Sequence, residues 1–375
     1  MPAGFLLLSA NTPWVFALAD ALSVSRPATA MRFYDVMTWR REKPRWPQGG
    51  SARLRRVMRV MPPGYAGRFQ TAFSPLLRAM IDRERARLRQ AGGGAEPFVI
   101  APYPYLEPWV ANVPDERLIY YSLDEYAFYG LDRVAKTHAM EDRLVSRAYR
   151  TICLSAWQAE VLRERNPARA ADILHFPLGV ETDFLNPAPD TPPEPGTIGY
   201  VGNLTDRVDW PFVKAVAEQA PALTFNILGS LTWLADGVGD QQPPDWKQAR
   251  DAALALPNVR HLGAVPQAEV PPFYWRSAVN WMPYDTAHGF NRASCPTKIM
   301  DAIAAGRPFA STSVPEAMLY PEQIRISDDP AEMASALVDL VASPTPSPAE
   351  MIAFASARTW DHRAAELLEM LSPAP

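Results

Sequence analysis

Cysteine is scarce in this chain. Among 375 residues there are two, Cys153 and Cys295, too few for a disulfide framework, and their separation does not match the spacing of metal-ligand pairs. A reducing compartment fits this usage, so we expect a cytoplasmic protein. Long apolar runs are also missing, since no stretch approaches the roughly 20 residues that a membrane-spanning helix needs. The start could pass for a signal peptide, but its apolar run Phe5–Leu8 is short, which favours a buried first strand and a following loop.

Several short catalytic motifs are absent as well. The sequence contains no G-x-G-x-x-G, Walker A, H-E-x-x-H, paired C-x-x-C or G-x-S-x-G pattern, which removes support from dehydrogenases, NTPases, zinc enzymes and serine hydrolases. No Asp-x-Asp is present of the kind that holds a metal ion against a diphosphate. We therefore expect a protein that uses neither a metal ion nor a cofactor.

Positive charge is concentrated at the N-terminal end. Residues 1–99 hold 16 Lys and Arg against 6 Asp and Glu, a net of +10, and the remainder holds 21 against 35, a net of −14. The basic stretch at 39–69 is interleaved with aromatic residues and methionine, which suits docking on an anionic membrane surface. Nucleic acid and a solvated arginine-rich loop are the alternatives, although no nucleic-acid-binding motif accompanies the charge.

Short apolar runs alternate with helical patterns along the whole chain, which predicts parallel sheets built from βαβ units. A stretch with five prolines, residues 186–196, reads as a semi-rigid linker between two such regions. We expect an α/β protein with two doubly wound, Rossmann-like domains that face a cleft. The predicted segments are an N-terminal domain over 1–185, a linker over 186–197, a C-terminal domain over 198–345, and a terminal helical segment over 346–375 that packs back toward the first domain.

The stretch PTKIMDAIAAGRP, residues 296–308, predicts a short buried helix with a charged N-terminal end. Thr297 suits the N-cap position and Gly306 ends the pattern. Lys298 and Asp301 are three residues apart and share a face. The helix N-terminus and Lys298 favour an anion, and Asp301 can accept two hydroxyl hydrogen bonds. Because a nucleotide presents a phosphate beside a diol, we predict a nucleotide site; a local Lys–Asp surface pair is the alternative.

Loops after other strands of the second half offer further ligand contacts, because ligands bind at the carboxyl ends of parallel strands. Gly202 and Gly229 each follow a predicted strand, where a missing side chain lets backbone approach a ligand, and a plain turn is the alternative. Asn203 and Arg207 lie in the loop after Gly202. Tyr284 begins a long polar loop that runs into the helix.

The first half offers a carboxylate at a comparable place. Asp124 and Glu125 follow a predicted strand, 117–122, and lie among tyrosines. Asp124 is a candidate general base with a raised pKa, and it could equally be the N-cap of the helix that follows. Asn11 and Trp14 lie in a predicted polar loop, SANTPW, after the first strand, and we expect both to face the cleft.

These motifs together resemble the C-terminal domain of GT-B glycosyltransferases, close to glycosyltransferase family 4. That family shows a P-x-K-x-x-E-x-x-A-x-G-x-P pattern, and this chain has Asp301 where the family has Glu and Ala293 at the place of a second Glu. In the first half, YYSLDEY, ICLSAWQAEVL and FPLGVETDFLNP are also similar to family elements. Asp124 and Lys298 further resemble the base and phosphate-binding residues of bacterial membrane-associated, xanthan-type glucuronosyltransferases.

The resemblance implies a metal-independent glycosyltransferase of polysaccharide biosynthesis that moves a sugar from a nucleotide diphosphate sugar to a lipid-linked or cell-surface polysaccharide acceptor. Asp124 would be the base, and Asn11 and Trp14 would bind the acceptor. The donor-binding residues would be Gly202, Asn203, Arg207, Gly229, Tyr284, Thr297, Lys298 and Asp301. The basic N-terminal region would place the protein on the inner face of the cell membrane. A nucleotide-sugar epimerase on the same fold and a non-catalytic nucleotide-sugar-binding scaffold are the alternatives.

Overall fold

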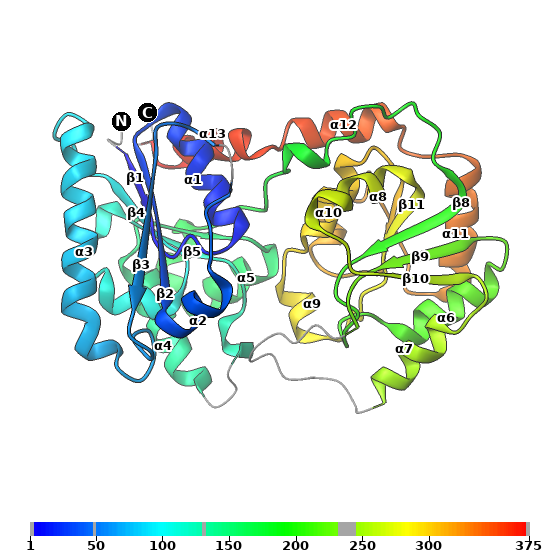
Figure 1. Ribbon diagram of the computed structural model, residues 1–375, viewed down its shortest axis with the longest axis horizontal. Coiled ribbons are helices and arrows are strands. Elements are labelled where there is room, and N and C mark those ends of the chain that lie inside the picture. Colours follow the sequence, from blue (N-terminus) through cyan, green and yellow to red (C-terminus); the bar gives the residue numbers. More distant parts are fainter. Residues whose placement is uncertain (1–3, 48–49, 130–132, 232–244, 373–375) are drawn as a thin grey trace. The chain divides into compact units, whose positions relative to one another are not determined.

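The computed structural model describes residues 4–47, 50–129, 133–231 and 245–372. The chain forms two compact units, each with its own parallel β-sheet (Figure 1). Unit 1 comprises Met1–Pro177 and Trp360–Pro375, and unit 2 comprises Leu178–Thr359. The expected α/β class with two doubly wound domains is confirmed, and the expected cleft between them stays a prediction.

The sheet of unit 1 has seven parallel strands in the order β3-β2-β1-β4-β5-β6-β7. Its strands are β1 (Phe5–Leu7), β2 (Ala28–Asp35), β3 (Leu54–Met61), β4 (Phe98–Ala101), β5 (Leu118–Ser122), β6 (Arg150–Cys153) and β7 (Ile173–His175). Parallel strands covered on both faces read as continuous apolar runs, and β1, β4 and β5 are buried along their whole length.

Helices cover this sheet. They are α1 (Pro13–Ser25), α2 (Val36–Glu42), α3 (Gln70–Ala91), α4 (Val134–Arg147), α5 (Ala156–Arg165) and α13 (Trp360–Met370). Leu77 and Ile81 of α3 and Leu144 of α4 share one core cluster with residues of the central strands. The C-terminal helix α13 packs beside α1 (Figure 1).

The sheet of unit 2 has six parallel strands in the order β10-β9-β8-β11-β12-β13, so β8 and β11 are neighbours at its centre. Its strands are β8 (Glu194–Val201), β9 (Thr224–Leu228), β10 (Val259–Gly263), β11 (Ser277–Met282), β12 (Phe309–Ser311) and β13 (Ile324–Ile326). Its helices are α6 (Trp210–Gln219), α7 (Trp246–Leu254), α8 (Val270–Arg276), α9 (Gly289–Ala293), α10 (Thr297–Ala304), α11 (Pro330–Ala342) and α12 (Pro348–Ser356).

Helix α10 is the short buried helix expected over 296–308. Ala302 and Ala304 are fully buried, and their small side chains let the helix lie close to its neighbours, among them α12. Gly306 has a φ of +64°, the left-handed conformation that commonly follows a helix end. The expected N-cap was wrong: Pro296 occupies that position, and Thr297 is already the first helical residue.

The proline-rich stretch 186–197 is attached to unit 2. Asn186 donates from its backbone and its side chain to the carbonyls of Ala304 and Ala305, each at 3.1 Å. The guanidinium of Arg307 donates to the carbonyls of Pro189 and Thr191, and β8 begins at Glu194. The chain passes between the units at 177–178 and 359–360 instead.

Two parts of the N-terminal region differ from their expected structure. The polar loop expected after the first strand becomes α1 from Pro13 on, so Trp14 is helical. The arginine-rich loop, one alternative for the basic stretch, is wrong over 54–61, because these residues form β3. Arg55 of β3 pairs with the buried carboxylate of Glu84 at 2.9 Å, and the charge is therefore partly internal.

The C-terminal segment also differs. The terminal helical segment expected over 346–375 contains two helices, since α12 ends at Ser356 and α13 begins at Trp360. The break coincides with the passage of the chain from unit 2 to unit 1. Just before it, the amide of Val180 donates to the carbonyl of Arg358 at 2.9 Å.

Candidate functional site

The centre of unit 2 is a topological switch point, where strand order reverses between β8 and β11, and open α/β sheets bind ligands there. The loops that follow these two strands meet. The amide of Asp209 donates to the carbonyl of Pro283 at 2.9 Å, and the amide of Asp285 donates to the carbonyl of Arg207 at 3.0 Å. The first turn of α10 lies beside both loops through Lys298.

Lys298 reaches the switch point from α10. Its Nζ donates a hydrogen bond of 2.9 Å to the hydroxyl of Tyr284, and the hydroxyl of the neighbouring Tyr200 donates to the carbonyl of Asn203 at 3.4 Å. Tyr284 is buried, so its phenolic oxygen is an acceptor held inside the site. A phosphate oxygen carries more negative charge than a phenol and would be the stronger partner for Lys298.

Arg207 lies on the same tyrosine. Its guanidinium carbon is 5.1 Å from the centre of the Tyr284 ring, and Lys298 Nζ is 5.3 Å from that centre. Asn291 accepts from Arg207 Nε at 2.8 Å, and Ser294 accepts from Nη2 at 3.0 Å. The amide of the fully buried Asn291 in turn donates to the carbonyls of Arg207 and Asp285. The guanidinium is therefore held in one orientation.

These two cations give the site a positive charge. In the part of the chain that the structure describes, neither Lys298 nor Arg207 forms an ion pair with a carboxylate. Burial opposes ionisation of Tyr284, but the charges of Lys298 and Arg207 outweigh burial and lower the pKa of this phenol. Two fixed cations without a close carboxylate partner can bind an anion with two charged groups.

Asp301 lies one turn further along α10. Its side chain is half-buried, and burial raises its pKa to about 7. Lys298 opposes this shift, Glu181 adds to it, and a hydrogen bond from Thr297 opposes it. Near neutral pH this carboxyl group exchanges a proton, and its ionised form can accept two hydroxyl hydrogen bonds.

The two glycines are required by close internal contacts. A Cβ atom on Gly202, whose φ is +155°, would lie 2.5 Å from Cε of Lys298. A Cβ atom on Gly229 would lie 1.8 Å from the carbonyl oxygen of Gly202. The structure thus gives these glycines a packing reason that their sequence positions did not reveal. Asn203 is exposed in the next position of the loop.

Asp124 of unit 1 follows β5, as expected. Its Oδ1 accepts the amide of Glu125 at 2.9 Å, and its Oδ2 accepts the hydroxyl of Tyr129 at 2.5 Å. The capping contact of the following 3-10 turn (Tyr126–Tyr129) is made by Glu125, whose Oε1 accepts the amide of Ala127 at 3.0 Å. Of the two interpretations of Asp124, the N-cap is wrong.

Asn11 and Trp14 lie after β1. Asn11 is exposed, and its Nδ2 donates to the carbonyl of Phe33 at 3.1 Å, which ties it to β2. Trp14 belongs to the first turn of α1, and its buried Nε1 has no hydrogen-bond partner among the described residues. Both follow the carboxyl end of β1, the sheet edge at which Asp124 follows β5. Their role as acceptor contacts stays a prediction.

The structure thus brings most predicted donor residues of unit 2 together. Lys298, Tyr284 and Gly202 are in direct contact, with Arg207 on the same tyrosine. Sequence reasoning missed Tyr200, Glu181 and Ser294, because a buried strand tyrosine, a loop glutamate and a serine carry no motif. No group of three or more His, Cys, Asp or Glu side chains among the described residues is arranged to hold a metal ion.

The second half of the chain is similar to a known protein family. Residues 195–343 match the family model "Glycosyl transferases group 1". A protein of Bacillus subtilis (strain 168) named "Putative teichuronic acid biosynthesis glycosyltransferase TuaH" is 27% identical over 182 residues, which cover 47% of this chain and 43% of that protein. The match therefore spans less than half of the length of that relative.

Solved structures match over the whole chain. The Anabaena protein HepE in complex with UDP has a TM-score of 0.68 at 14% identity and 99% coverage of both chains. Sucrose-phosphate synthase from Thermosynechococcus elongatus has a TM-score of 0.66 at 15% identity and 98% coverage of both. The fold is GT-B. At these identities the likeness concerns the fold alone, and the similarity to xanthan-type glucuronosyltransferases is not among these findings.

Proposed function

We propose that this chain is a glycosyltransferase that moves a sugar from a nucleoside diphosphate sugar to an acceptor hydroxyl. The observation that carries the proposal is the pair of cations, Lys298 and Arg207, on the Tyr284 ring at the switch point of unit 2. The family match over residues 195–343 supports the donor half. The UDP complex of HepE makes uridine diphosphate sugars the first donors to test.

In the donor half, Lys298 and Arg207 meet the charge of the diphosphate, which grows as the sugar leaves. Lys298 exchanges the hydroxyl of Tyr284 for a phosphate oxygen. Asp301, one turn along α10, accepts the ribose hydroxyls, and the exposed Asn203 and the Thr297 hydroxyl line the approach. We propose that these side chains, without a metal ion, neutralise the leaving group.

In the acceptor half, Asp124 is the base. It takes the proton of the acceptor hydroxyl as the acceptor oxygen bonds to the anomeric carbon, and the bond from that carbon to the diphosphate breaks with both electrons leaving on the nucleotide. Oδ2 of Asp124 holds the hydroxyl of Tyr129 in this structure. The acceptor hydroxyl therefore has to share this oxygen or replace Tyr129. Asn11 and Trp14 are the proposed acceptor contacts at the same sheet edge.

The first experiment is a thermal-shift screen of nucleotide sugars, since a ligand that binds the folded chain stabilises it by its occupancy. The donor that stabilises the chain is then incubated with glycan acceptors, with and without EDTA, and release of the nucleoside diphosphate is followed. We expect release that depends on acceptor and withstands EDTA. Loss of activity with EDTA that added metal restores would overturn the metal-independent mechanism.

The same assay separates the two alternatives. An epimerase would convert the donor without an acceptor, so acceptor-independent turnover would favour it. A scaffold would bind the donor but transfer no sugar. If sugar transfer is unchanged in Asp124→Ala and Lys298→Ala, the active site lies elsewhere in the chain.

We also propose that the acceptor is lipid-linked and that unit 1 docks on an anionic membrane. The teichuronic acid relative supports a role in polysaccharide biosynthesis. Helix α2 follows β2, so it lies at the sheet edge of the proposed acceptor site, and it exposes Met37 and Trp39 beside Arg40. The side chains of Arg40 and Lys43 contact no acidic group among the described residues. Apolar side chains within a basic surface suit an anionic bilayer.

Flotation with vesicles tests the membrane proposal. We expect binding to vesicles containing phosphatidylglycerol, weakened by salt, and little binding to phosphatidylcholine alone. Trp39→Asp should abolish it, whereas Val24→Asp, an exposed position at the far end of α1, should not. Binding that is indifferent to salt and to Trp39→Asp would overturn the proposal. The described residues contain no helix that is long and apolar enough to cross a bilayer.

A further inference from the structure

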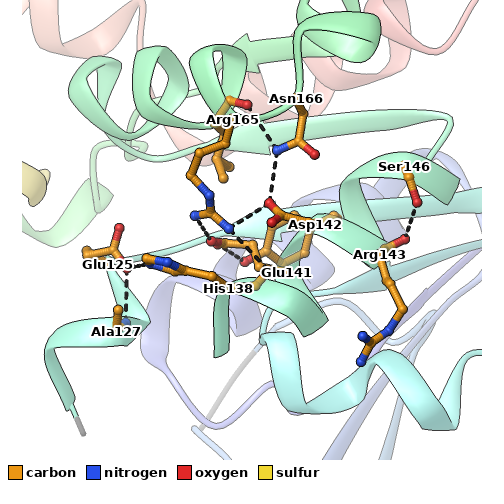
Figure 2. A network of polar contacts seen from close by, with 11 residues as sticks. Glu125, Ala127, His138, Glu141, Asp142, Arg143, Ser146, Arg165 and Asn166 are labelled. Carbon is orange, nitrogen blue, oxygen red and sulfur yellow. Dashed lines mark hydrogen bonds and ion pairs between the residues drawn. The ribbon is translucent and has the colours of Figure 1, made fainter. Parts of the chain in front are cut away.

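A cluster of ionisable side chains with a buried centre lies behind the turn that carries Asp124. We call it the α4 acid cluster, and its members come from β5, the turn after it, α4 and the end of α5 (Figure 2). They are Tyr120, Glu125, His138, Glu141, Asp142 and Arg165. The proposed transfer reaction does not use any of them directly.

Glu141 is the centre of the cluster. It is 1% exposed, and its two oxygens are held from two sides: Tyr120 of β5 donates to Oε1 at 2.6 Å, and Arg165 donates to Oε2 at 2.8 Å. Arg165 also donates to Asp142 at 2.6 Å and to the carbonyl of His138 at 3.1 Å. Through this carboxyl group, α4 is fixed to the strand before it and to the helix after it.

The cluster carries more acid than base. The guanidinium of Arg165 pairs with two carboxyl groups, those of Glu141 and Asp142, and a third carboxyl group, that of Glu125, lies beside the imidazole of His138. Burial raises the pKa of Glu141 to about 7; Tyr120 and Arg165 oppose this shift, and Glu125 adds to it. A buried network in which every group is held by a partner is rigid, and losing one partner leaves a buried charge unpaired.

One contact in the cluster is nearly formed. Nε2 of His138 lies 3.5 Å from Oε1 of Glu125, and this buried nitrogen has no hydrogen-bond partner among the described residues. The other contact of Glu125 Oε1 is the amide of Ala127. A small movement of α4 would therefore change how Glu125 is held.

Glu125 connects the α4 acid cluster to Asp124. Its side chain points into the cluster and is buried, while its backbone amide points to Asp124 and donates to Oδ1 at 2.9 Å. Glu125 thus contacts the cluster through its side chain and Asp124, the proposed base, through its backbone amide.

We propose that Glu141 and His138 are positioning residues for Asp124: Glu141 fixes α4 between β5 and α5, His138 then steadies Glu125, and the Glu125 amide aims the Asp124 carboxylate. This inference rests on the proposed function of Asp124 as base. A base that is misplaced by a fraction of a bond length loses rate without loss of donor binding, because proton transfer depends steeply on geometry.

The test compares Glu141→Gln with Asp142→Asn. The first removes the charge at the centre, and the second removes the charge of the other carboxylate that Arg165 contacts. Among the described residues, the side chain of Asp142 makes no hydrogen bond or ion pair with Glu125 or with the imidazole of His138. We expect Glu141→Gln to lower kcat for transfer about tenfold or more, with KM for the donor unchanged, and Asp142→Asn to stay near the parent. Hydrogen exchange should rise in residues 123–129 in Glu141→Gln and in no strand of unit 2.

Two variants of His138 refine the test. Gln keeps an N–H donor near the place of Nε2, whereas Leu fills similar space without one, so His138→Gln should retain more transfer activity than His138→Leu. Equal losses in both would show that His138 only packs. If Glu141→Gln does not fold, Tyr120→Phe removes one of the two holding contacts and takes its place.

The outcomes are distinct from those of the proposed function. If the parent transfers no sugar, the proposed function fails. Hydrogen exchange still tests the positioning role in that case, because unchanged protection of residues 123–129 in Glu141→Gln would overturn it. Parent-like kcat in Glu141→Gln, or an equal loss in donor binding and in transfer, would overturn it as well.

Discussion

Unit 2 places two cations after the central strands of its sheet, whereas unit 1 places a carboxylate, that of Asp124, after β5 at the same edge of its own sheet. In unit 2 the cations Lys298 and Arg207 share one tyrosine ring. In unit 1 Asp124 faces outward, and Glu125 and Glu141 are buried behind it. A diphosphate needs cations and an acceptor hydroxyl needs a base, so one fold, used twice, provides opposite chemistry by its loops.

Each unit also holds a carboxyl group whose pKa is raised to about 7, with burial as the largest cause. Glu141 is closed in by Tyr120 and Arg165 and cannot reach a ligand without unfolding of the cluster. Asp301 lies on the helix that carries Lys298 and keeps part of its surface exposed. A raised pKa thus belongs to an internally fixed carboxyl group in unit 1 and to a proposed ligand-binding carboxyl group in unit 2.

The largest expected effect is a loss of sugar transfer without a loss of nucleotide binding when the proposed base of unit 1 is changed. Asp124→Asn keeps the shape of the side chain but cannot take a proton, so we expect transfer to fall by about 10² to 10⁴, while nucleotide affinity stays within about twofold of the parent. Steady-state transfer and calorimetric titration of UDP measure the two quantities. Reduced UDP affinity in Asp124→Asn would mean that unit 1 contributes to the donor site.

The reverse pattern is expected for Lys298→Ala. Loss of this cation removes a charge-assisted contact to the diphosphate, and transfer should fall by about 10² to 10³, this time with weaker UDP binding. Lys214→Ala is the matched control, because that lysine belongs to the surface pair Lys214–Glu218 of the same unit. If UDP affinity is the same in the parent and in Lys298→Ala, the diphosphate does not lie on α10.

The donor half could be predicted well from sequence because its parts are local. Lys298 and Asp301 share one turn, and Tyr284 precedes them in the segment between β11 and α10, which also contains the short helix α9. Helix periodicity and strand ends suffice to place such residues. The hydrogen bonds that fix the guanidinium of Arg207 could not be predicted from the sequence. Their acceptors, Asn291 and Ser294, are distant from Arg207 along the chain, and such partners have no sequence pattern.

The first unit was harder to predict for a physical reason. Its β3 is an edge strand in which Arg55 lies between the buried Leu54 and Val57 without a regular alternation of buried and exposed residues. Its charge was therefore interpreted as a membrane or loop signal. The internal partner, Glu84, lies on α3, and sequence does not reveal that pairing. The α4 acid cluster was missed likewise, because its members come from β5, the turn after it, α4 and α5, and contacts between such distant residues have no sequence pattern.

A smaller effect is expected from the proton on Asp301. Its pKa of about 7 means that the carboxyl is mostly protonated below that pH and ionised above it, and ribose hydroxyls donate more strongly to the ionised form. The parent should therefore bind UDP about fivefold more tightly at pH 8 than at pH 6. Ionisation of UDP itself also changes over this range, and Asp301→Asn measures that contribution, so the fivefold change is counted beyond the change seen in this variant. If the UDP affinities of the parent and of Asp301→Asn change with pH in the same way, Asp301 does not bind the ribose.

The smallest effect concerns stability and compares the two raised carboxyl groups directly. An acid whose pKa is raised in the folded chain contributes stability that is present below its unfolded pKa and is lost as pH rises through the folded value. For Glu141 this window runs from about 4.3 to about 7, so the free energy of unfolding of unit 1 should fall across it. Hydrogen exchange of each unit, followed from pH 5 to pH 8, measures the slopes separately. Glu141→Gln should flatten the slope of unit 1 and leave that of unit 2, and Asp301→Asn should do the opposite. A slope of unit 1 that is the same in Glu141→Gln and the parent would show that another group carries the proton, and the cluster would then have to be held by His138 or Glu125 instead.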